Sequence, residues 1–185
     1  MFENFGFYAV DIDYVKYLHS KDNQVFYNAS AGYDKKPYLG IIVGLNDFKY
    51  CIPLTSAKPK QLNWRNITEH NYLIYEYVRT AALHTNDLYK QIGDDTYKKF
   101  LAVLEIRKMI PVNDSLYSYI EFAKIADPSY LALLQKEYRF LLPYKDAILS
   151  KAKTLYKKQK ETGVIKNCYC NFILLETALG EYDSQ

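Results

Sequence analysis

One short segment of the 185-residue chain places two hydroxyl groups beside two ammonium groups. The segment is Thr55-Ser56-Ala57-Lys58-Pro59-Lys60. A lysine donates hydrogen bonds to the nonbridging oxygens of a phosphodiester, and serine or threonine hydroxyls can orient those oxygens. The same residue types are also common in solvated surface turns. Composition alone therefore leaves a phosphate site and a plain surface turn both open.

Two further cations stand before the strand that we expect to pair with this region. Lys35 and Lys36 precede that strand. In an antiparallel hairpin the start of one strand lies beside the end of its partner. The pairing is therefore expected to bring Lys36 within reach of Thr55 and Ser56.

Aromatic and basic residues also follow the segment. Trp64 and Arg65, with His70 nearby, offer a stacking surface and a cation for an unpaired base. Residues 144–163 hold six lysines and two acidic residues, so their net charge of +4 exceeds the +3 of the whole chain. Such lysines are more often a solvated helix face than an RNA track. The candidates for RNA contact among them are Lys151, Lys157 and Lys158.

Other catalytic patterns find no support in the sequence. The seven glycines never approach a phosphate-binding loop pattern, which argues against a nucleotide cofactor. The three histidines lie in different segments, and no Cys or His pair has the spacing of a structural zinc site. Cys168 and Cys170 would share one face of a strand, where two thiols are more often core residues than ligands. We expect no metal and no other cofactor.

Composition places the chain among ordinary globular proteins. Hydrophobic residues make up 49% and charged residues 24%, which argues against intrinsic disorder, and the length fits one domain over residues 1–185. The odd number of cysteines, three, favours a reducing compartment. No apolar run approaches a membrane span of about 18 residues, and the N-terminus lacks signal-peptide features. These observations predict a cytoplasmic protein that does not enter a membrane.

The periodicity of apolar residues predicts strands first and helices later. Asn46-Asp47 is a turn signal between two β-branched runs, Asp127-Pro128 is a helix start, and Gly163 is a helix stop. The expected strands are residues 5–10, 38–45, 49–54, 72–78, 100–112 and 164–172. The expected helices are 14–18, 130–141, 144–162 and 174–182. Residues 55–68 are expected to form a long loop, and residues 81–99 are either helical or an insertion. Strands followed by helices, without βαβ alternation, predict an α+β fold around an antiparallel sheet.

These residues also carry a resemblance to a known family. The strings Lys36-Pro-Tyr-Leu-Gly-Ile-Ile-Val and Lys49-Tyr-Cys-Ile-Pro-Leu-Thr-Ser-Ala-Lys58 resemble, in order and spacing, the hallmark of the ToxN/AbiQ family of type III toxin-antitoxin endoribonucleases. The resemblance spans nearly the whole chain, and residues 81–99 match least. It continues through Tyr14-Val-Lys-Tyr-Leu18, Lys108-Met-Ile-Pro-Val112, residues 130–140, and Cys170-Asn-Phe-Ile-Leu-Leu-Glu176.

The resemblance implies a fold, an activity and partners. The fold would be α+β, with a strongly bent antiparallel sheet flanked by helices, similar to the MazF-like toxins. The activity would be metal-independent, sequence-preferring cleavage of mRNA, in bacterial abortive infection against phage. The antitoxin partner would be RNA, made of repeated pseudoknots that the toxin excises from a precursor and that then occupy its groove. Whether protein and RNA close into a ring or form a smaller complex stays open.

The resemblance also assigns residues. The family's Thr-Ser-x-Lys falls on Thr55, Ser56 and Lys58, with Ala57 in place of the usual proline, while Lys36 and Tyr33 match its upstream lysine and tyrosine. The expected chemistry is attack by the 2′-hydroxyl of RNA, giving a 2′,3′-cyclic phosphate and a 5′-hydroxyl. The additional residues expected to bind RNA are Lys35, Lys60, Trp64, Arg65, Lys151, Lys157 and Lys158.

Two alternatives stay open at this level. A noncatalytic RNA-binding module would use the same basic surface to sequester a structured transcript. A DNA-directed toxin or repressor would use that surface on DNA. Without the family resemblance, the residues favour the nuclease and the RNA-binding module about equally.

Overall fold

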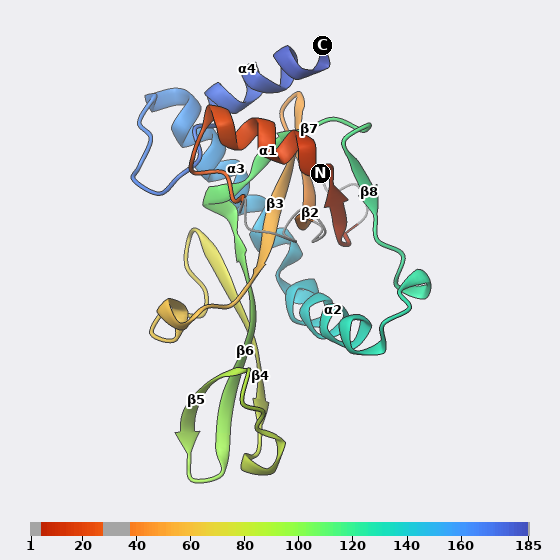
Figure 1. The fold of residues 1–185 in the computed structure, drawn as a ribbon. Coiled ribbons are helices and arrows are strands. Elements are labelled where there is room, and N and C mark those ends of the chain that lie inside the picture. Colours follow the sequence, from red (N-terminus) through yellow and green to blue (C-terminus); the bar gives the residue numbers. More distant parts are fainter. Residues whose placement is uncertain (1–4, 28–37, 185) are drawn as a thin grey trace.

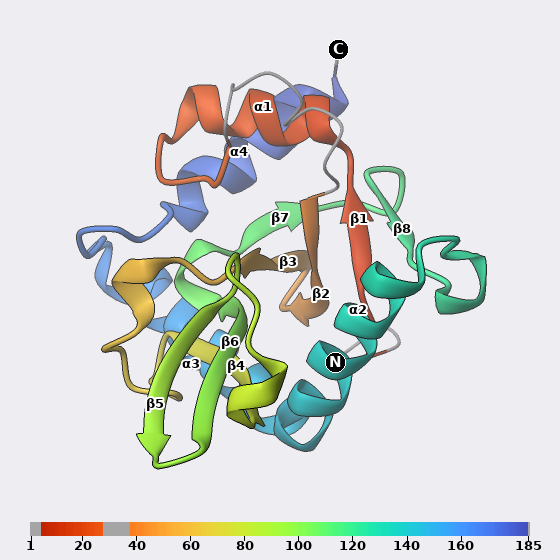
Figure 2. The same cartoon turned by 60° about the horizontal axis from the view of Figure 1, so that its bottom comes forward.

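The computed structural model describes residues 5–27 and 38–184. Figures 1 and 2 show a bent sheet with helices packed around it. The strands are β1 (Tyr8–Val10), β2 (Tyr38–Leu45), β3 (Phe48–Ser56), β4 (Asn71–Val78), β5 (Leu88–Gly93), β6 (Thr96–Glu105), β7 (Ile110–Val112) and β8 (Tyr117–Tyr119). The α-helices are α1 (Ile12–Lys21), α2 (Pro128–Leu141), α3 (Lys145–Thr162) and α4 (Phe172–Asp183). The α+β prediction, with an antiparallel sheet, is confirmed.

The sheet is organised around the hairpin of β2 and β3. The order is β4-β6-β3-β2-β1-β8, with β5 added beside β6 and β7 beside β3, and every pairing is antiparallel. Leu45 pairs with Phe48, so Asn46 and Asp47 form the predicted two-residue turn, and Asn46 takes the positive φ of 54° that such turns need. The hairpin prediction is confirmed.

The sheet bends where β3 changes partners. Cys51 pairs with Ile110 of β7, whereas Leu54 pairs with Leu104 of β6. Three residues along β3 therefore correspond to six residues along the partner chain. The extra residues form a 3₁₀ turn, Ile106–Lys108. Pro53 lies between the two ladders and has no N–H to continue either of them. The single strand predicted at 100–112 is therefore wrong: it is two strands separated by this turn.

Close backbone packing accompanies the bend. Gly40 pairs with Pro53, and a Cβ atom at position 40 would lie 2.3 Å from Cys51 Sγ and 2.5 Å from the Ile52 carbonyl oxygen. Only glycine fits at that distance. The two strands are thus held together at the point where β3 leaves the hairpin.

Residues 81–99 belong mostly to the sheet. A 3₁₀ turn (Thr80–Ala82) leads into β5, and β5, β6 and β4 form a three-stranded extension that projects away from the rest of the molecule (Figure 1). The helix alternative for this segment is wrong, because residues 88–93 and 96–99 are strand.

Local signals explain the helix boundaries. Asp11 caps α1 by accepting hydrogen bonds from two backbone N–H groups, and Asp127 caps α2 in the same way. Pro128 occupies the first turn of α2, where its missing N–H costs nothing. Gly163 ends α3 in the left-handed conformation, with a φ of 66°. The three later helices therefore match the sequence prediction closely.

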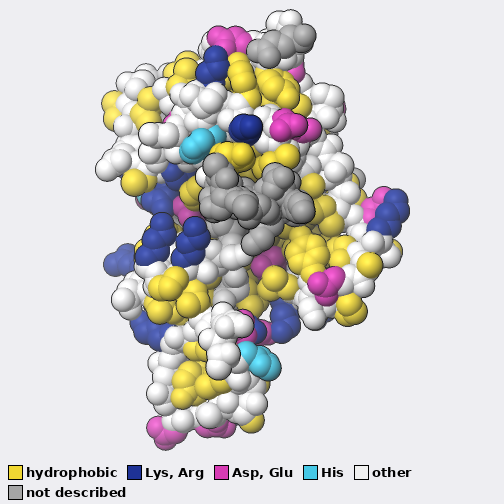
Figure 3. Space-filling model, in the orientation of Figure 1, with side chains coloured by type: hydrophobic (Ala, Val, Ile, Leu, Met, Phe, Trp, Pro, Cys, Tyr) yellow, Lys and Arg dark blue, Asp and Glu magenta, His cyan; other side chains and the backbone are white. Residues whose placement is uncertain are grey.

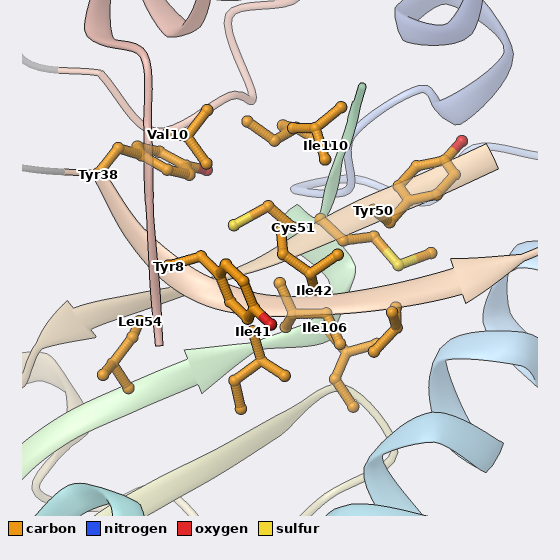
Figure 4. Packing of buried hydrophobic residues seen from close by; sticks show 14 of the residues in the cluster. Tyr8, Val10, Tyr38, Ile41, Ile42, Tyr50, Cys51, Leu54, Ile106 and Ile110 are labelled. Atoms are coloured by element: carbon orange, nitrogen blue, oxygen red, sulfur yellow. The ribbon is translucent and has the colours of Figure 1, made fainter. Parts of the chain in front are cut away.

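The helices cover a core rich in aromatic and β-branched side chains. Figure 4 shows side chains from β1, β2 and β3, with Ile106 and Ile110, pointing into one cluster. Helices α1 and α4 lie side by side (Figures 1 and 2), where Lys21 and Glu181 form an ion pair of 2.8 Å. A smaller cluster on the other face of β4 and β6 contains Leu73, Phe100 and Val103.

The strand predicted at 164–172 is wrong. Residues 163–171 form a connection without strand pairing, in which Cys168 is exposed and Cys170 is buried. Its backbone is held by other groups: Cys170 N–H donates to the Arg107 carbonyl at 3.1 Å, and Gln159 Nε2 donates to the Cys170 carbonyl at 3.0 Å. Across residues 5–27 and 38–184, no three His, Cys, Asp or Glu side chains are grouped as a metal ion would need. In the same ranges no helix has both the length and the apolar character to cross a bilayer.

Candidate active site

The two hydroxyl groups lie at the end of β3, just beyond the bend. Thr55 pairs with Val103 and Ser56 with Ala102. Side chains alternate along a strand, so Thr55 shares a face with Val103 of the smaller cluster, and Ser56 shares the opposite face with Ala102 of the main core. Ser56 is exposed and Thr55 is half-buried. Together the hydroxyls flank the strand end rather than facing one side of it.

Lys58 follows directly and has a fixed backbone. Its N–H donates to Gln61 Oε1 at 2.5 Å, and its carbonyl accepts a hydrogen bond from Gln61 N–H at 2.9 Å. Gln61 ends the 3₁₀ turn Pro59–Gln61 and is only 2% exposed. Ala57 N–H donates to the Leu101 carbonyl at 3.2 Å, which extends the β6 pairing past Ser56. The Lys58 side chain is therefore exposed on a rigid loop next to the hydroxyls.

This arrangement predicts a positioning role for Gln61. Replacing Gln61 by methionine keeps the side-chain volume but removes the acceptor for Lys58 N–H, so the loop should lose its fixed geometry. If this corner is catalytic, we expect kcat for RNA cleavage to fall between about 10-fold and 100-fold with KM nearly unchanged. Steady-state kinetics on a short RNA substrate measure this.

The conservative variant provides the control. Gln61→Glu retains an acceptor oxygen and should recover most of kcat, with thermal melting used to confirm that both variants are folded. A loss of kcat that matches the loss of folded protein in the melting curves of both variants would show that Gln61 serves general stability only.

The upstream candidates lie outside the described residues. Tyr33, Lys35 and Lys36 fall within residues 28–37, so their proximity to Ser56 stays a prediction. The register is consistent with that prediction, because Gly40 pairs with Pro53 and β2 begins at Tyr38. The chain thus enters β2 beside the point where β3 approaches Thr55.

A hollow of about 540 Å³ lies along the segment that joins β3 to β4. Trp64, Arg65 and His70 all line it, so the structure brings these three predicted residues together. The guanidinium of Arg107, from the 3₁₀ turn at the bend, lies 5.5 Å from the centre of the Trp64 ring. Glu105 anchors Arg107 through an ion pair of 2.9 Å. Figure 3 shows Lys and Arg side chains gathered on this side of the molecule.

His70 is fixed at the inner wall of this hollow. Its N–H donates to Thr68 Oγ1 at 3.1 Å, and its carbonyl accepts from Ile106 N–H at 2.8 Å. Burial is the main cause that lowers the pKa of His70, and the nearby cations add to the shift while Glu69 opposes it. The imidazole is therefore held mostly neutral at pH 7 and can both donate and accept a hydrogen bond.

The lysines of α3 do not form a continuous track. Lys151 Nζ donates to the Thr68 carbonyl at 2.8 Å and lies 4.4 Å above the Tyr72 ring, and burial lowers its pKa. Lys157 lies 3.6 Å from Glu161, and Lys160 lies 2.7 Å from the buried Glu176. Lys158 is exposed and has no ion pair with any described residue. Lys60 is also exposed.

Sequence reasoning missed several residues at this site. Arg107 and Tyr169 carried no motif because long-range contacts bring them to the site, whereas Gln61 acts locally, through hydrogen bonds to the Lys58 backbone. Arg107 fell within the single strand predicted at 100–112. The interruption at Pro53 is the signal that could have placed it in a turn.

Known proteins match nearly the whole chain. A family model described as "Toxin ToxN, type III toxin-antitoxin system" matches residues 6–180. The protein named Endoribonuclease ToxN from Bacillus thuringiensis subsp. kurstaki is 28% identical, over 97% of this chain and 85% of its own. Endoribonuclease ToxN from Pectobacterium atrosepticum is 26% identical, and the match covers 97% of this chain and 94% of the relative. Endoribonuclease AbiQ from Lactococcus lactis subsp. lactis is 24% identical, and the match covers 97% of this chain and 90% of the relative.

Solved structures show the same fold. One, described as "A processed non-coding RNA regulates a bacterial antiviral system", has a TM-score of 0.70 and 23% identity, over 95% of this chain and 98% of its own. Another, described as "selective toxin inhibition by a non-coding RNA pseudoknot", has a TM-score of 0.67 and 26% identity, and the match covers 99% of this chain and 100% of the solved chain. The match of 6–180, with both hydroxyls and Lys58 inside it, shows that this chain belongs to the ToxN family of type III toxin-antitoxin toxins.

Proposed function

We propose that this protein is a metal-independent endoribonuclease that cuts RNA at the end of β3. The observation that carries the proposal is the placement of Thr55, Ser56 and Lys58 together on a rigid, solvent-open corner beside a basic aromatic hollow. The matched relatives are named endoribonucleases, which supports the same activity here.

The geometry suits an internal transesterification. The 2′-hydroxyl of RNA attacks the adjacent phosphorus while the 5′-oxygen leaves from the opposite side, and the protein must align these groups and stabilise the negative phosphorane. Hydroxyls on opposite faces of the strand end can contact different oxygens of one phosphate. Lys58, with Lys36 and Tyr33 as proposed partners, would neutralise the developing charge and assist proton transfer. The products would be a 2′,3′-cyclic phosphate and a 5′-hydroxyl.

The adjoining surface would hold the rest of the strand. Trp64 and Arg107 offer a base-stacking platform, and phosphates need cations spread along the path. The further proposed RNA contacts are Lys35, Lys60, Arg65, Lys151, Lys157 and Lys158.

The partner would be a repeat pseudoknot RNA acting as the antitoxin. One solved relative is described as inhibited by a non-coding RNA pseudoknot, which supports this assignment. We infer that the protein acts in the bacterial cytoplasm, on mRNA and on the precursor of its own antitoxin, and that it contributes to abortive infection by phage.

Incubation of the purified protein with RNA in EDTA tests the proposal. We expect cleavage in EDTA, no cleavage of DNA of the same sequence, and fragments ending in a 2′,3′-cyclic phosphate and a 5′-hydroxyl, identified by mass spectrometry. A requirement for magnesium, or 5′-phosphate ends, would contradict the mechanism. Intact RNA in every condition would instead identify a noncatalytic binding module.

A further inference from the structure

A second hollow, of about 270 Å³, lies between α3 and the chain segments on either side of it. One wall is a single face of α3, with Lys151, Thr154, Leu155 and Lys158 at helical spacing. The opposite wall comes from the β3–β4 segment and from residues 164–169. Its volume is close to the lower end of the range for small-ligand pockets, about 300–1,000 Å³. Its size therefore suits one small ligand.

The charge of the lining favours an anionic ligand. Three ammonium groups line it, those of Lys151, Lys158 and Lys166, against one carboxylate, that of Glu69. Lys151 already donates to the Thr68 carbonyl, which fixes its position. Lys158 and Lys166 form no ion pair within residues 5–27 and 38–184, so their charges are available to a ligand.

The rest of the lining suits a flat heterocycle. Tyr169 and His70 contribute aromatic rings whose centres are 5.3 Å apart, at 68° to each other, and Leu155 adds an apolar surface. Thr154 adds a hydroxyl. Aromatic surface with a few polar groups and adjacent cations is the combination that binds an unpaired base and its phosphate.

The two hollows adjoin. Glu69 and His70 line both of them, so the hollow that holds Trp64 and Arg107 continues past His70 to α3. A single strand leaving Ser56 would follow this path, with Trp64 first and Tyr169 last.

We propose that the α3 hollow binds one unpaired nucleotide of the RNA, several positions from the scissile bond, and so sets sequence preference at that position. The base lies against Leu155 and Tyr169, and Lys158 and Lys166 bind the flanking phosphates. This inference rests on the proposed endoribonuclease activity for its role in sequence preference. Binding at the hollow can be tested without cleavage.

The first test measures binding. Wild type, Lys158→Glu and Lys153→Glu are titrated with a single-stranded RNA carrying 2′-O-methyl groups, which cannot be cut. Lys153 is exposed on the same helix but lines neither hollow, so it carries the same charge reversal outside the site. We expect Lys158→Glu to weaken binding about tenfold at 0.1 M salt and lower the salt slope by about one, with Lys153→Glu within about twofold. Equal effects of both variants would overturn the proposal.

The second test measures sequence preference. Thr154→Phe fills the hollow, and Thr177→Phe makes the same change on an exposed position of α4. Sequencing the ends cut from a randomised RNA pool should show a preference at one position outside the scissile dinucleotide, lost in Thr154→Phe and kept in Thr177→Phe. An unchanged preference in Thr154→Phe would overturn the proposal. If wild type cuts no RNA, the proposed function fails, while the binding test still decides whether the hollow contacts RNA.

Discussion

Replacing Ser56 by alanine is expected to lower the single-turnover rate of RNA cleavage by about 10²-fold to 10³-fold. Removing one preorganised donor to a developing oxyanion has an effect of this size. RNA affinity should stay within about twofold, because phosphate contacts spread over many cations carry it. Growth inhibition on expression in a bacterial host should disappear with the cleavage.

Ser118→Ala is the matched control. Ser118 is also an exposed strand serine, but it lies in β8, at the far edge of the sheet from β6. The Ser118→Ala variant should cleave RNA at the wild-type rate. Full toxicity of the Ser56→Ala variant would remove Ser56 from the mechanism. Thr55→Ala, on the other face of the strand, separates the contributions of the two hydroxyls.

Replacing Glu137 by glutamine is expected to stabilise the protein at neutral pH. Glu137 lies on the inner face of α2 and is 3% exposed, and burial raises the pKa of its carboxyl group to about 8. No described residue donates a hydrogen bond to this group. Above pH 4.5 the unfolded chain releases the proton that the folded protein keeps, so stability falls as pH rises from about 4.5 to about 8. At pH 7 this amounts to about 3 kcal/mol.

Denaturant unfolding across that pH range measures the effect. The wild type and Glu137→Gln should have similar free energies of unfolding near pH 4. The advantage of the variant over the wild type should then grow steadily up to pH 8. The stability of Glu137→Leu should depend on pH in the same way as that of Glu137→Gln, so this variant is the control for the new amide group. Parallel pH curves for wild type and both variants would show that Glu137 titrates normally.

The sequence predicted those parts of the fold that local signals determine. The turn at Asn46-Asp47, the cap at Asp127 and the stop at Gly163 each act through their own backbone, so the hairpin and the later helices were predictable. The segment 163–171 was mispredicted because its apolar residues resemble a strand. Its backbone groups are instead satisfied by Gln159 and by the Arg107 carbonyl, which periodicity cannot reveal.

The residues of the candidate site also fall into those that local sequence predicts and those that only tertiary packing places. Thr55, Ser56 and Lys58 could be found because they are contiguous in the sequence. Arg107 and Tyr169 reach the site only through the 3₁₀ turn and the α3–α4 connection, whose geometry depends on tertiary packing. The split of the α3 lysines between ion pairs and open surface was likewise invisible to a count of charges.

The position of β3 has a consequence for how such a protein is controlled. This strand is paired along its whole length, with β2 over Phe48–Pro53, with β7 over Lys49–Cys51 and with β6 over Leu54–Ser56. Its amide protons should be among the slowest in the molecule to exchange with solvent. The hydroxyls of the proposed site, Thr55 and Ser56, would thus take up their positions as the sheet folds. A molecule that covers this corner would then be sufficient to control the proposed activity, and its removal would restore cleavage.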